Sequence, residues 1–345
     1  MAPVIREASH AGSWYTADGS ELSTSLSGWL KKVDATALPL PLSACNTDAS
    51  SSSDALNLPI KGCRAIIGPH AGYSYSGPAA AYAYRCIDTA VIKRIFILGP
   101  SHHVYLDGCA LSQCDEYETP LGNLELDKEM LANLTSTGDF STMSKATDED
   151  EHSLEMHLPY IYRVFHGTGA KVVPIMIGAI NTSKEQKFGR ILAPYLANPE
   201  NFFVVSSDFC HWGSRFSYTY YRSGPDAQPV SLSSRIQPEG VPIHESIRRL
   251  DEAGMHAIEY PHSPDSASKT ATQARDAFAK YIKTTRNTVC GRHPIGVLLA
   301  ALAEIESTQA IKSECRFTRY EQSSPCLTPR DSSVSYASAF VRFLN

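Results

Sequence analysis

The sequence predicts an α/β protein, with a central mixed β-sheet flanked by helices. Three short, continuous apolar segments that are rich in β-branched and aromatic residues indicate this class; they span residues 64–68, 94–98 and 201–207. Continuous apolar runs are typical of strands covered on both faces, because a strand with one exposed face alternates apolar and polar residues. Helical patterns lie between these strands, which favours helices packed on the sheet.

Composition and charge narrow the class of protein further. The chain has 345 residues with 43% hydrophobic and 19% charged residues, which is ordinary for a globular protein, and we expect a single domain over residues 1–345. A net charge of −5 and a pI near 6.2 give no support for a nucleic-acid partner. The sequence has no long apolar segment and no signal sequence at its start, so we expect an intracellular protein without membrane insertion.

The cysteines agree with a reducing compartment. The chain has nine of them, an odd number without any C-x-x-C spacing, which argues against a disulfide framework and a structural zinc knuckle. Cys290 stands apart because it precedes an apolar helix predicted from residue 295. A thiol at a helix N-terminus has a lowered pKa, which favours a reactive or metal-binding thiolate.

The first half of the chain alternates predicted helices and strands. Leu22, Leu26 and Leu30 recur at helical spacing and predict a helix over 20–33. Residues 34–60 are rich in Pro and Ser, and we expect a flexible insertion there because the segment cannot bury enough apolar surface. The elements expected after it are a strand at 64–68, a helix at 77–86, the central strand at 94–100 and a helix at 126–134.

Residues 147–157 predict a further helix, and its acidic residues and histidines have two interpretations. Thr147 is a candidate N-cap, and Glu151 and Glu155 would share one helix face, four residues apart. Glu151, His152, Glu155 and His157 could ligate a metal, but we favour carboxylates that complement the helix dipole on a packed helix. In that interpretation His152 or Glu155 supports a neighbouring site from its second layer.

The second half predicts three more helices and the rest of the sheet. A strand at 171–178 and a helix at 183–196 come before the strand at 201–207. Residues 222–242 are rich in Pro and Ser and indicate a loop insertion. The remaining predicted elements are helices at 243–259, 271–283 and 295–305, and late antiparallel strands at 315–322 and 333–344.

Histidines follow three of the predicted strands and form the candidate site. His70 follows the strand at 64–68, His102 and His103 follow the central strand, and His211 lies just after the strand at 201–207. The carboxyl ends of neighbouring strands meet at one edge of an α/β sheet, where ligands bind. A single histidine of this kind is most often a hydrogen-bonded structural residue, but three with the same placement favour one shared site.

These motifs resemble the Memo family, named for mediators of receptor-driven cell motility. The segments that carry the resemblance are REASHAGSWY, RAIIGPHAGYSYSG, RIFILGPSHH, TDEDEHSLEMHLPY, FFVVSSDFCHWG, CGRHPIGVLL and DSSVSYASAF. They cover most of the chain outside the two insertions. The family is similar in fold to class III extradiol dioxygenases of the LigB type, in which two histidines and a carboxylate hold non-haem Fe(II).

The resemblance also implies roles for individual residues. His70 and His102 correspond to metal ligands, and His211 corresponds to the acid/base histidine, with Asp208 beside it. Cys290 stands where the dioxygenases place their carboxylate. A thiolate makes the site softer, so the implied cofactor is one ion of Fe(II) or copper, and dioxygenase activity does not follow from the resemblance alone.

Two functions remain open at this stage. One is a non-haem metal-dependent oxidoreductase, in which Asp208 orients His211 and His211 moves protons. The other is a non-catalytic adaptor for a phosphotyrosine peptide or signalling protein, with Trp14, Tyr75 and Arg215 binding the ligand. The resemblance implies a role in signalling, cell motility or metal homeostasis, in the cytoplasm and also the nucleus. The absence of a G-x-S-x-G elbow argues against a serine hydrolase.

Overall fold

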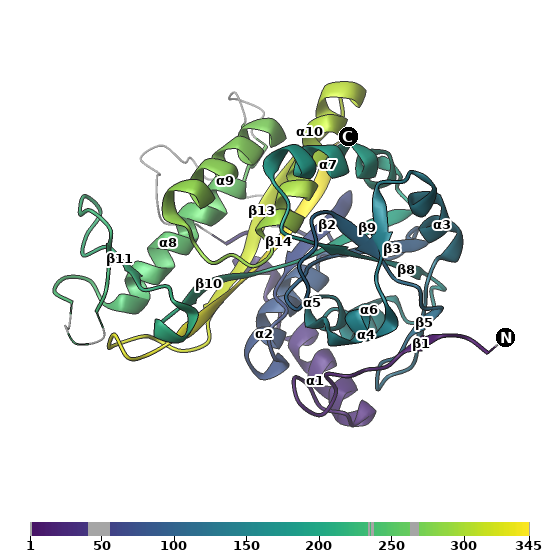
Figure 1. Cartoon of the computed structure of the whole chain (residues 1–345), viewed down its shortest axis with the longest axis horizontal. Coiled ribbons are helices and arrows are strands. Elements are labelled where there is room, and N and C mark those ends of the chain that lie inside the picture. Colours follow the sequence, from purple (N-terminus) through teal and green to yellow (C-terminus); the bar gives the residue numbers. More distant parts are fainter. Residues whose placement is uncertain (1, 41–55, 234, 236–237, 263–268, 345) are drawn as a thin grey trace.

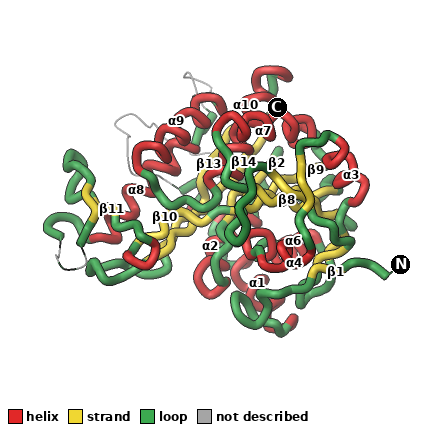
Figure 2. The backbone as a smooth tube through the Cα atoms, viewed as in Figure 1, coloured by secondary structure: helices red, strands yellow, loops and turns green. Residues whose placement is uncertain are grey.

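A nine-stranded mixed sheet crosses the molecule, with helices on both of its faces (Figures 1 and 2). The computed structural model describes residues 2–40, 56–233, 235, 238–262 and 269–344. The strands follow the order β10-β14-β2-β9-β3-β8-β4-β7, and β13 pairs with β14. This confirms the predicted α/β class with a central mixed sheet.

The middle of the sheet is parallel and almost completely buried. It consists of β2 (Cys63–Gly68), β9 (Asn201–Ser206), β3 (Arg94–Pro100) and β8 (Lys171–Ile177). Ile66 lies opposite Val204 and Phe96 opposite Phe203, so the strands run side by side in matching register. The apolar runs in the sequence therefore predicted these four strands correctly.

The antiparallel part of the sheet is larger than the sequence suggests. β14 (Ser333–Leu344) pairs with β13 (Lys312–Gln322) and β2, both antiparallel, which confirms the orientation of the two late strands. β14 nevertheless lies inside the sheet, because β13 pairs along one of its edges while β2 and β10 (Asp208–Trp212) pair with different parts of the other edge. The sequence does not predict β10, because only five residues separate Gly213 from the end of the preceding apolar run.

Helices cover the two faces of the sheet as separate groups. One face carries α7 (Thr182–Ala197), α8 (Ile243–Ile258), α9 (Ala271–Thr285) and α10 (Arg292–Gln309). The other carries α1 (Gly19–Lys31), α2 (Tyr73–Tyr84), α4 (Lys145–Asp150), α5 (His152–Glu155) and α6 (Leu158–Phe165). α3 (Lys128–Ser136) lies near the β7 end of the sheet.

The predicted helix at 147–157 is wrong in its continuity. Ser144, rather than Thr147, caps α4, and the chain becomes extended at Glu151, with φ −88° and ψ 110°. The Glu151 side chain accepts a hydrogen bond from the backbone N–H of Ser153 and so starts α5. Because the helix is broken there, Glu151 and Glu155 do not share one helix face.

Two further expectations concern the insertions. Residues 41–55 of the first insertion lie outside the described residues, while Leu38 and Ile60 at its ends are buried in the core. The second insertion, at 222–242, contains the strand β12 (Val230–Ser231). This strand pairs antiparallel with β11 (Tyr220–Tyr221), which lies just before the insertion, and the two form a short β-ribbon.

Several short strands escaped prediction because two or three residues give no periodic pattern. β1 (Ile5–Arg6), β5 (Glu116–Tyr117) and β6 (Leu124–Glu125) form a separate small sheet. β4 (Cys109–Leu111) and β7 (Phe140–Thr142) extend the main sheet beyond β8. Within the described part of the chain, no helix combines the length and the apolar character needed to cross a membrane.

The packing of α5 on β3 can be tested at Gly99. A Cβ atom at this position would lie 2.6 Å from Ser153 Oγ and 2.8 Å from Leu154 Cδ2. We expect Gly99→Ala to destabilise the protein by about 1–3 kcal/mol, because overpacking a buried contact forces neighbouring atoms to move. Urea unfolding measures the effect, and Gly108→Ala is the control, since nothing lies within 4 Å of its Cβ position. Equal unfolding midpoints for the two variants would contradict the predicted packing.

Candidate metal centre

Two histidines meet at the carboxyl edge of the parallel strands. β2 and β3 lie on either side of β9, and His70 and His102 follow their ends by two residues each. Their ring centroids lie 5.2 Å apart and the rings cross at 73°. Two imidazoles bound to one ion at about 2.1 Å in tetrahedral directions have centroids roughly 5 Å apart. The predicted convergence is confirmed for these two residues.

The protonation of His70 is fixed by its neighbour. Ser206 Oγ donates a hydrogen bond to the carbonyl of Ser153, at 2.7 Å. The same hydroxyl lies 2.6 Å from His70 Nδ1 and therefore accepts from it, so Nδ1 carries the proton. Burial lowers the pKa of His70 and keeps the ring neutral. The unprotonated Nε2 is then free to bind a metal.

His102 is held in a similar way by Glu151. The carboxylate accepts from the backbone N–H of His102 at 2.7 Å and from its Nδ1 at 2.8 Å. Burial disfavours the charged carboxylate, but its hydrogen bonds with His102 outweigh burial and lower the Glu151 pKa to about 2. A carboxylate on the second nitrogen is the usual support of a metal-binding histidine.

His152 brings a third imidazole to the same place. The candidate ligand nitrogens of His70, His102 and His152 all lie within 4.8 Å of one another, so this group can hold one metal ion. His152 stacks on His102 with ring centroids 4.3 Å apart, and burial together with the charge of His102 lowers its pKa to about 3. From the sequence, His152 is a metal ligand in the less favoured of two interpretations and a supporting residue in the favoured one.

Cys290 contacts the group from the start of α10. Its Sγ lies 3.2 Å from His70 Nε2, and it accepts a hydrogen bond from the backbone N–H of Asp208 at 3.2 Å. The predicted lowering of the Cys290 pKa is wrong for the metal-free protein. Burial raises it, and the charge of Asp208 adds to that effect, so the thiol is protonated. A metal cation reverses this balance, since a coordinating thiol loses its proton.

Asp208 and His211 lie on β10, so His211 does not follow the end of a parallel strand as expected. The Asp208 carboxylate accepts from the backbone N–H of His70 at 2.9 Å, and burial raises its pKa to about 7. His211 Nδ1 lies 2.9 Å and 3.0 Å from the carbonyls of Phe209 and Thr288. Carbonyls only accept, so Nδ1 carries the proton and Nε2 has the free lone pair. These carbonyls, rather than Asp208, orient His211.

Of the predicted ligand-binding residues, Trp14 contacts the histidine group directly. Trp14 stacks on His152 with ring centroids 4.5 Å apart. The Arg215 guanidinium lies over the Phe216 ring at 4.5 Å, and the edge of that ring meets His211. Tyr75, in the first turn of α2, is 57% exposed.

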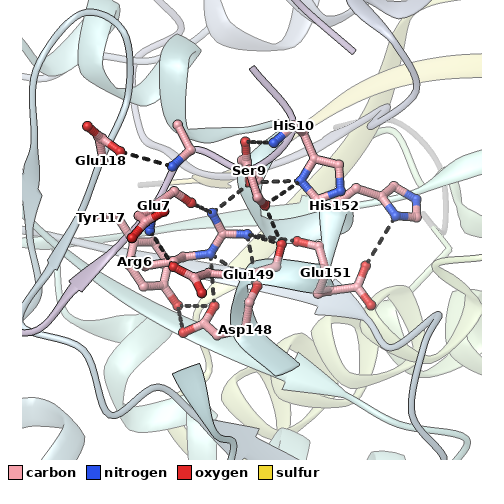
Figure 3. Close-up of polar contacts among 12 residues, drawn as sticks. Arg6, Glu7, Ser9, His10, Tyr117, Glu118, Asp148, Glu149, Glu151 and His152 are labelled. Atoms are coloured by element: carbon pink, nitrogen blue, oxygen red, sulfur yellow. Dashed lines mark hydrogen bonds and ion pairs between the residues drawn. The ribbon is translucent and has the colours of Figure 1, made fainter. Parts of the chain in front are cut away.

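A buried arginine fixes the helix break that carries Glu151 and His152 (Figure 3). Arg6 forms ion pairs with Asp148 at 3.1 Å and with Glu155 at 2.7 Å, and its side chain is fully buried. It also donates to the backbone carbonyls of Asp148 and Glu151, at 2.8 Å and 3.2 Å. Arg6 therefore satisfies the last carbonyls of α4, which have no partner within that helix.

The side chains present fit a transition metal. His70 and His102 each donate a hydrogen bond from Nδ1 to an oxygen acceptor, which directs Nε2 toward the other rings, and Cys290 Sγ lies 3.2 Å from His70 Nε2. Ligand atoms on one ion are separated by about 3–3.6 Å when metal–ligand bonds are about 2.0–2.3 Å long. Nitrogen and sulfur donors suit iron and copper rather than Mg²⁺ or Ca²⁺.

Comparison with known proteins identifies the family of this chain. A family model described as Memo-like protein matches residues 6–340. The chain belongs to the Memo family. It is 46% identical to Protein MEMO1 of Homo sapiens over 336 residues, covering 97% of this chain and 96% of the human protein. Protein memo-1 homolog of Caenorhabditis elegans is 39% identical, covering 96% of this chain and 81% of the worm protein.

One solved structure is also similar in arrangement. It is the crystal structure of an uncharacterized protein from Escherichia coli K12, with a TM-score of 0.43 and 10% sequence identity. The match covers 79% of this chain and 99% of that chain. We draw no conclusion on function from it.

The sequence-based search missed Ser206 as the partner of His70 and Glu151 as the partner of His102. Ser206 ends a strand with an apolar middle, and hydroxyls in such positions are common without any function. Glu151 stood in a row of acidic residues, whose general pattern indicated a helix start. Both residues could have been considered as candidates, because a metal-binding histidine needs a hydrogen-bond acceptor for its second ring nitrogen and a hydroxyl or a carboxylate can serve.

The Arg6 cluster predicts a specific pH dependence of stability. Burial raises the Glu155 pKa, but hydrogen bonds from His10, Arg6 and Tyr15 prevail and bring it from 4.5 to about 2. The folded-state pKa lies below the unfolded one, so Glu155 contributes its full stability above about pH 4.5 and loses it as the pH falls toward 2.

We therefore expect Glu155→Gln to lower the free energy of unfolding by about 3–5 kcal/mol at pH 7, since it leaves Arg6 short of one buried partner. The difference from wild type shrinks below about pH 4.5. Urea unfolding at a series of pH values measures it, with the exposed Glu129→Gln as control. A pH-independent difference, or none at pH 7, would contradict the role given to this ion pair.

Proposed function

We propose that this protein binds one iron or copper ion and has a redox role in cell signalling, motility or metal homeostasis. The observation that carries the proposal is the contact between Cys290 Sγ and His70 Nε2, at 3.2 Å, beside the ring of His102. Both histidines are hydrogen-bonded through Nδ1 to an oxygen acceptor, as metal-binding histidines usually are.

The proposed ligands are His70, His102 and Cys290. His152 is the alternative third ligand, since its nitrogen belongs to the same group. Cys290 is preferred because His152 stacks face to face on His102, and Glu151 lies 3.7 Å from its Nδ1, too far for a hydrogen bond. A thiolate beside two imidazoles favours copper(I) and iron over harder cations.

His211 is the proposed acid/base group. Its Nδ1 is held by two carbonyls, so only Nε2 exchanges protons with a bound molecule. Burial lowers its pKa, which favours the neutral ring that accepts a proton. A bound iron or copper ion would supply one-electron chemistry and an open position for dioxygen. The residues of the chain then provide orientation and proton transfer.

The likeness to class III extradiol dioxygenases of the LigB type belongs to this proposal as well. The mixed sheet and the placement of two histidines after neighbouring strands support it. Cys290 in place of a carboxylate sets this chain apart from those enzymes, so dioxygenase turnover is the narrower form of the proposal. The proposed location is the cytoplasm, with the nucleus as a second compartment.

Anaerobic titration of the metal-free protein with Fe(II) and Cu(I) tests the proposal. We expect one ion per chain in the wild type, no stoichiometric binding in His70→Ala/His102→Ala, and at least tenfold weaker Cu(I) binding in Cys290→Ser, because the soft thiolate is lost. The exposed His166→Ala is the matched control. A larger loss in His152→Ala than in Cys290→Ser would make His152 the third ligand.

Oxygen consumption on admitting air then separates two roles. Sustained uptake supports a non-haem oxidoreductase, and binding without uptake supports a metal carrier or a signalling adaptor. Absence of stoichiometric binding for both metals would overturn the proposal.

A phosphotyrosine-binding adaptor is the second candidate. The observation that favours it is the position of Arg215, which packs on Phe216 next to His211, with the exposed Tyr75 available as an aromatic wall. Preference for a tyrosine-phosphorylated peptide over its unphosphorylated form, lost in Arg215→Gln but kept in the exposed Arg330→Gln, supports this function. Equal binding of both peptides by the wild type contradicts it.

A further inference from the structure

A cavity lies between α7, α9 and α10. These three helices belong to the group on one face of the sheet (Figure 1). Its volume is about 280 Å³, close to the lower end of the range for small-molecule sites. None of the proposed metal ligands or the other predicted site residues lines it. Its occupant is therefore a matter separate from the metal centre.

The cavity has an apolar wall. Ile180, Phe278, Ala279 and Ile282 line it, and Ile180 and Phe278 are each 3% exposed. Two of these residues, Phe278 and Ile282, lie four positions apart on α9 and so share one face of that helix. Such a wall suits the hydrocarbon part of a ligand, since its removal from water is favourable.

The same cavity carries three positive side chains, two of them without a partner. The side chains of Lys283 and Arg292 form no hydrogen bond or ion pair with any described residue. Arg275 pairs with its sequence neighbour Asp276, whose side chain is 64% exposed. Exposed pairs of this kind are weak, so Arg275 can turn to another anion at little cost.

One carboxylate also lines the cavity, and it is already engaged. Glu185 accepts a hydrogen bond from His293 Nδ1 at 2.7 Å. It is packed so closely over α10 that a Cβ atom at Gly296 would lie 2.6 Å from Glu185 Cδ. Three cationic side chains thus face a single paired carboxylate, which leaves the cavity with an excess of positive charge.

We propose that this cavity binds a small organic anion with an apolar body. The body lies on Phe278 and Ile282, and its carboxylate or phosphate group is bound by Lys283 and Arg292. A planar guanidinium binds the two oxygens of such a group at once, and the lysine adds a compact charge. Neither a neutral apolar molecule nor a bare inorganic anion satisfies both halves of the cavity.

The site lies next to the turn that carries Cys290, but it does not depend on the proposed metal. Arg292 follows Cys290 by two residues, and between them Gly291 donates its N–H to Ser207 Oγ at 3.1 Å. A Cβ atom at Gly291 would lie 2.3 Å from the Ser206 carbonyl, so the turn is packed directly against the end of β9. Binding in the cavity can be measured on the metal-free protein.

Calorimetric titration of the full-length, metal-free protein with hexanoate and with hexyl phosphate tests the proposal. We expect saturable binding of at least one of them, at least tenfold tighter than that of hexanol and of inorganic phosphate. The stronger of the two identifies the preferred head group. Arg292→Gln and Lys283→Gln are each expected to weaken this binding at least tenfold.

Lys280→Gln is the matched control, because Lys280 lies exposed on the same helix outside the cavity. Ala279→Phe provides a second test, since the added ring fills the apolar part and is expected to abolish binding without removing a charge. Circular dichroism confirms that each variant is folded. Absence of binding by both anions, equal binding of hexanol, or unchanged affinity in the Lys283→Gln/Arg292→Gln double variant would overturn the proposal.

Discussion

The parallel pairing of β2, β9 and β3 is the constraint on which the candidate centre depends. These strands are buried on both faces and share one register, so their carboxyl ends come out together at one edge of the sheet. His70 and His102 follow the outer two strands, and Ser206 at the end of the middle strand accepts the Nδ1 proton of His70. The same parallel strands thus determine both the position of the His70 ring and the nitrogen that carries its proton.

A second layer of buried polar contacts completes the site. Glu151 can bind both the backbone and the ring of His102 because the chain is extended there, between α4 and α5. Arg6, near the start of the chain, binds the carbonyls on both sides of that break. Removing one partner from a buried ion pair is costly, so this arrangement holds Glu151 and His152 in place at the edge of the sheet.

Apolar runs in the sequence predicted the four central strands and most of the long helices, because burial of continuous apolar segments dominates there. The sequence did not predict β10 or the break at Glu151. Both depend on partners distant in sequence: β10 pairs with β14, and the break is held by Arg6. Local patterns carry no information about such partners.

The candidate site, like the fold, was predicted only where local sequence patterns determine it. Strand-end placement identified His70 and the neighbouring pair His102 and His103, and the family resemblance selected His102. His211, in contrast, reaches the region from an antiparallel strand and His152 from a helix only four residues long. The pKa of Cys290 was misjudged for a physical reason. Burial and the nearby Asp208 charge act on the thiol more strongly than the helix terminus does.

X-ray absorption at the metal edge can identify the ligands in protein loaded anaerobically with one equivalent of Fe(II) or Cu(I). We expect imidazole scattering from two histidines together with one sulfur ligand, and loss of the sulfur contribution in Cys290→Ser. A spectrum with only oxygen ligands, or one in which the imidazole contribution persists in His70→Ala/His102→Ala, would contradict a metal centre built from the strand-end histidines.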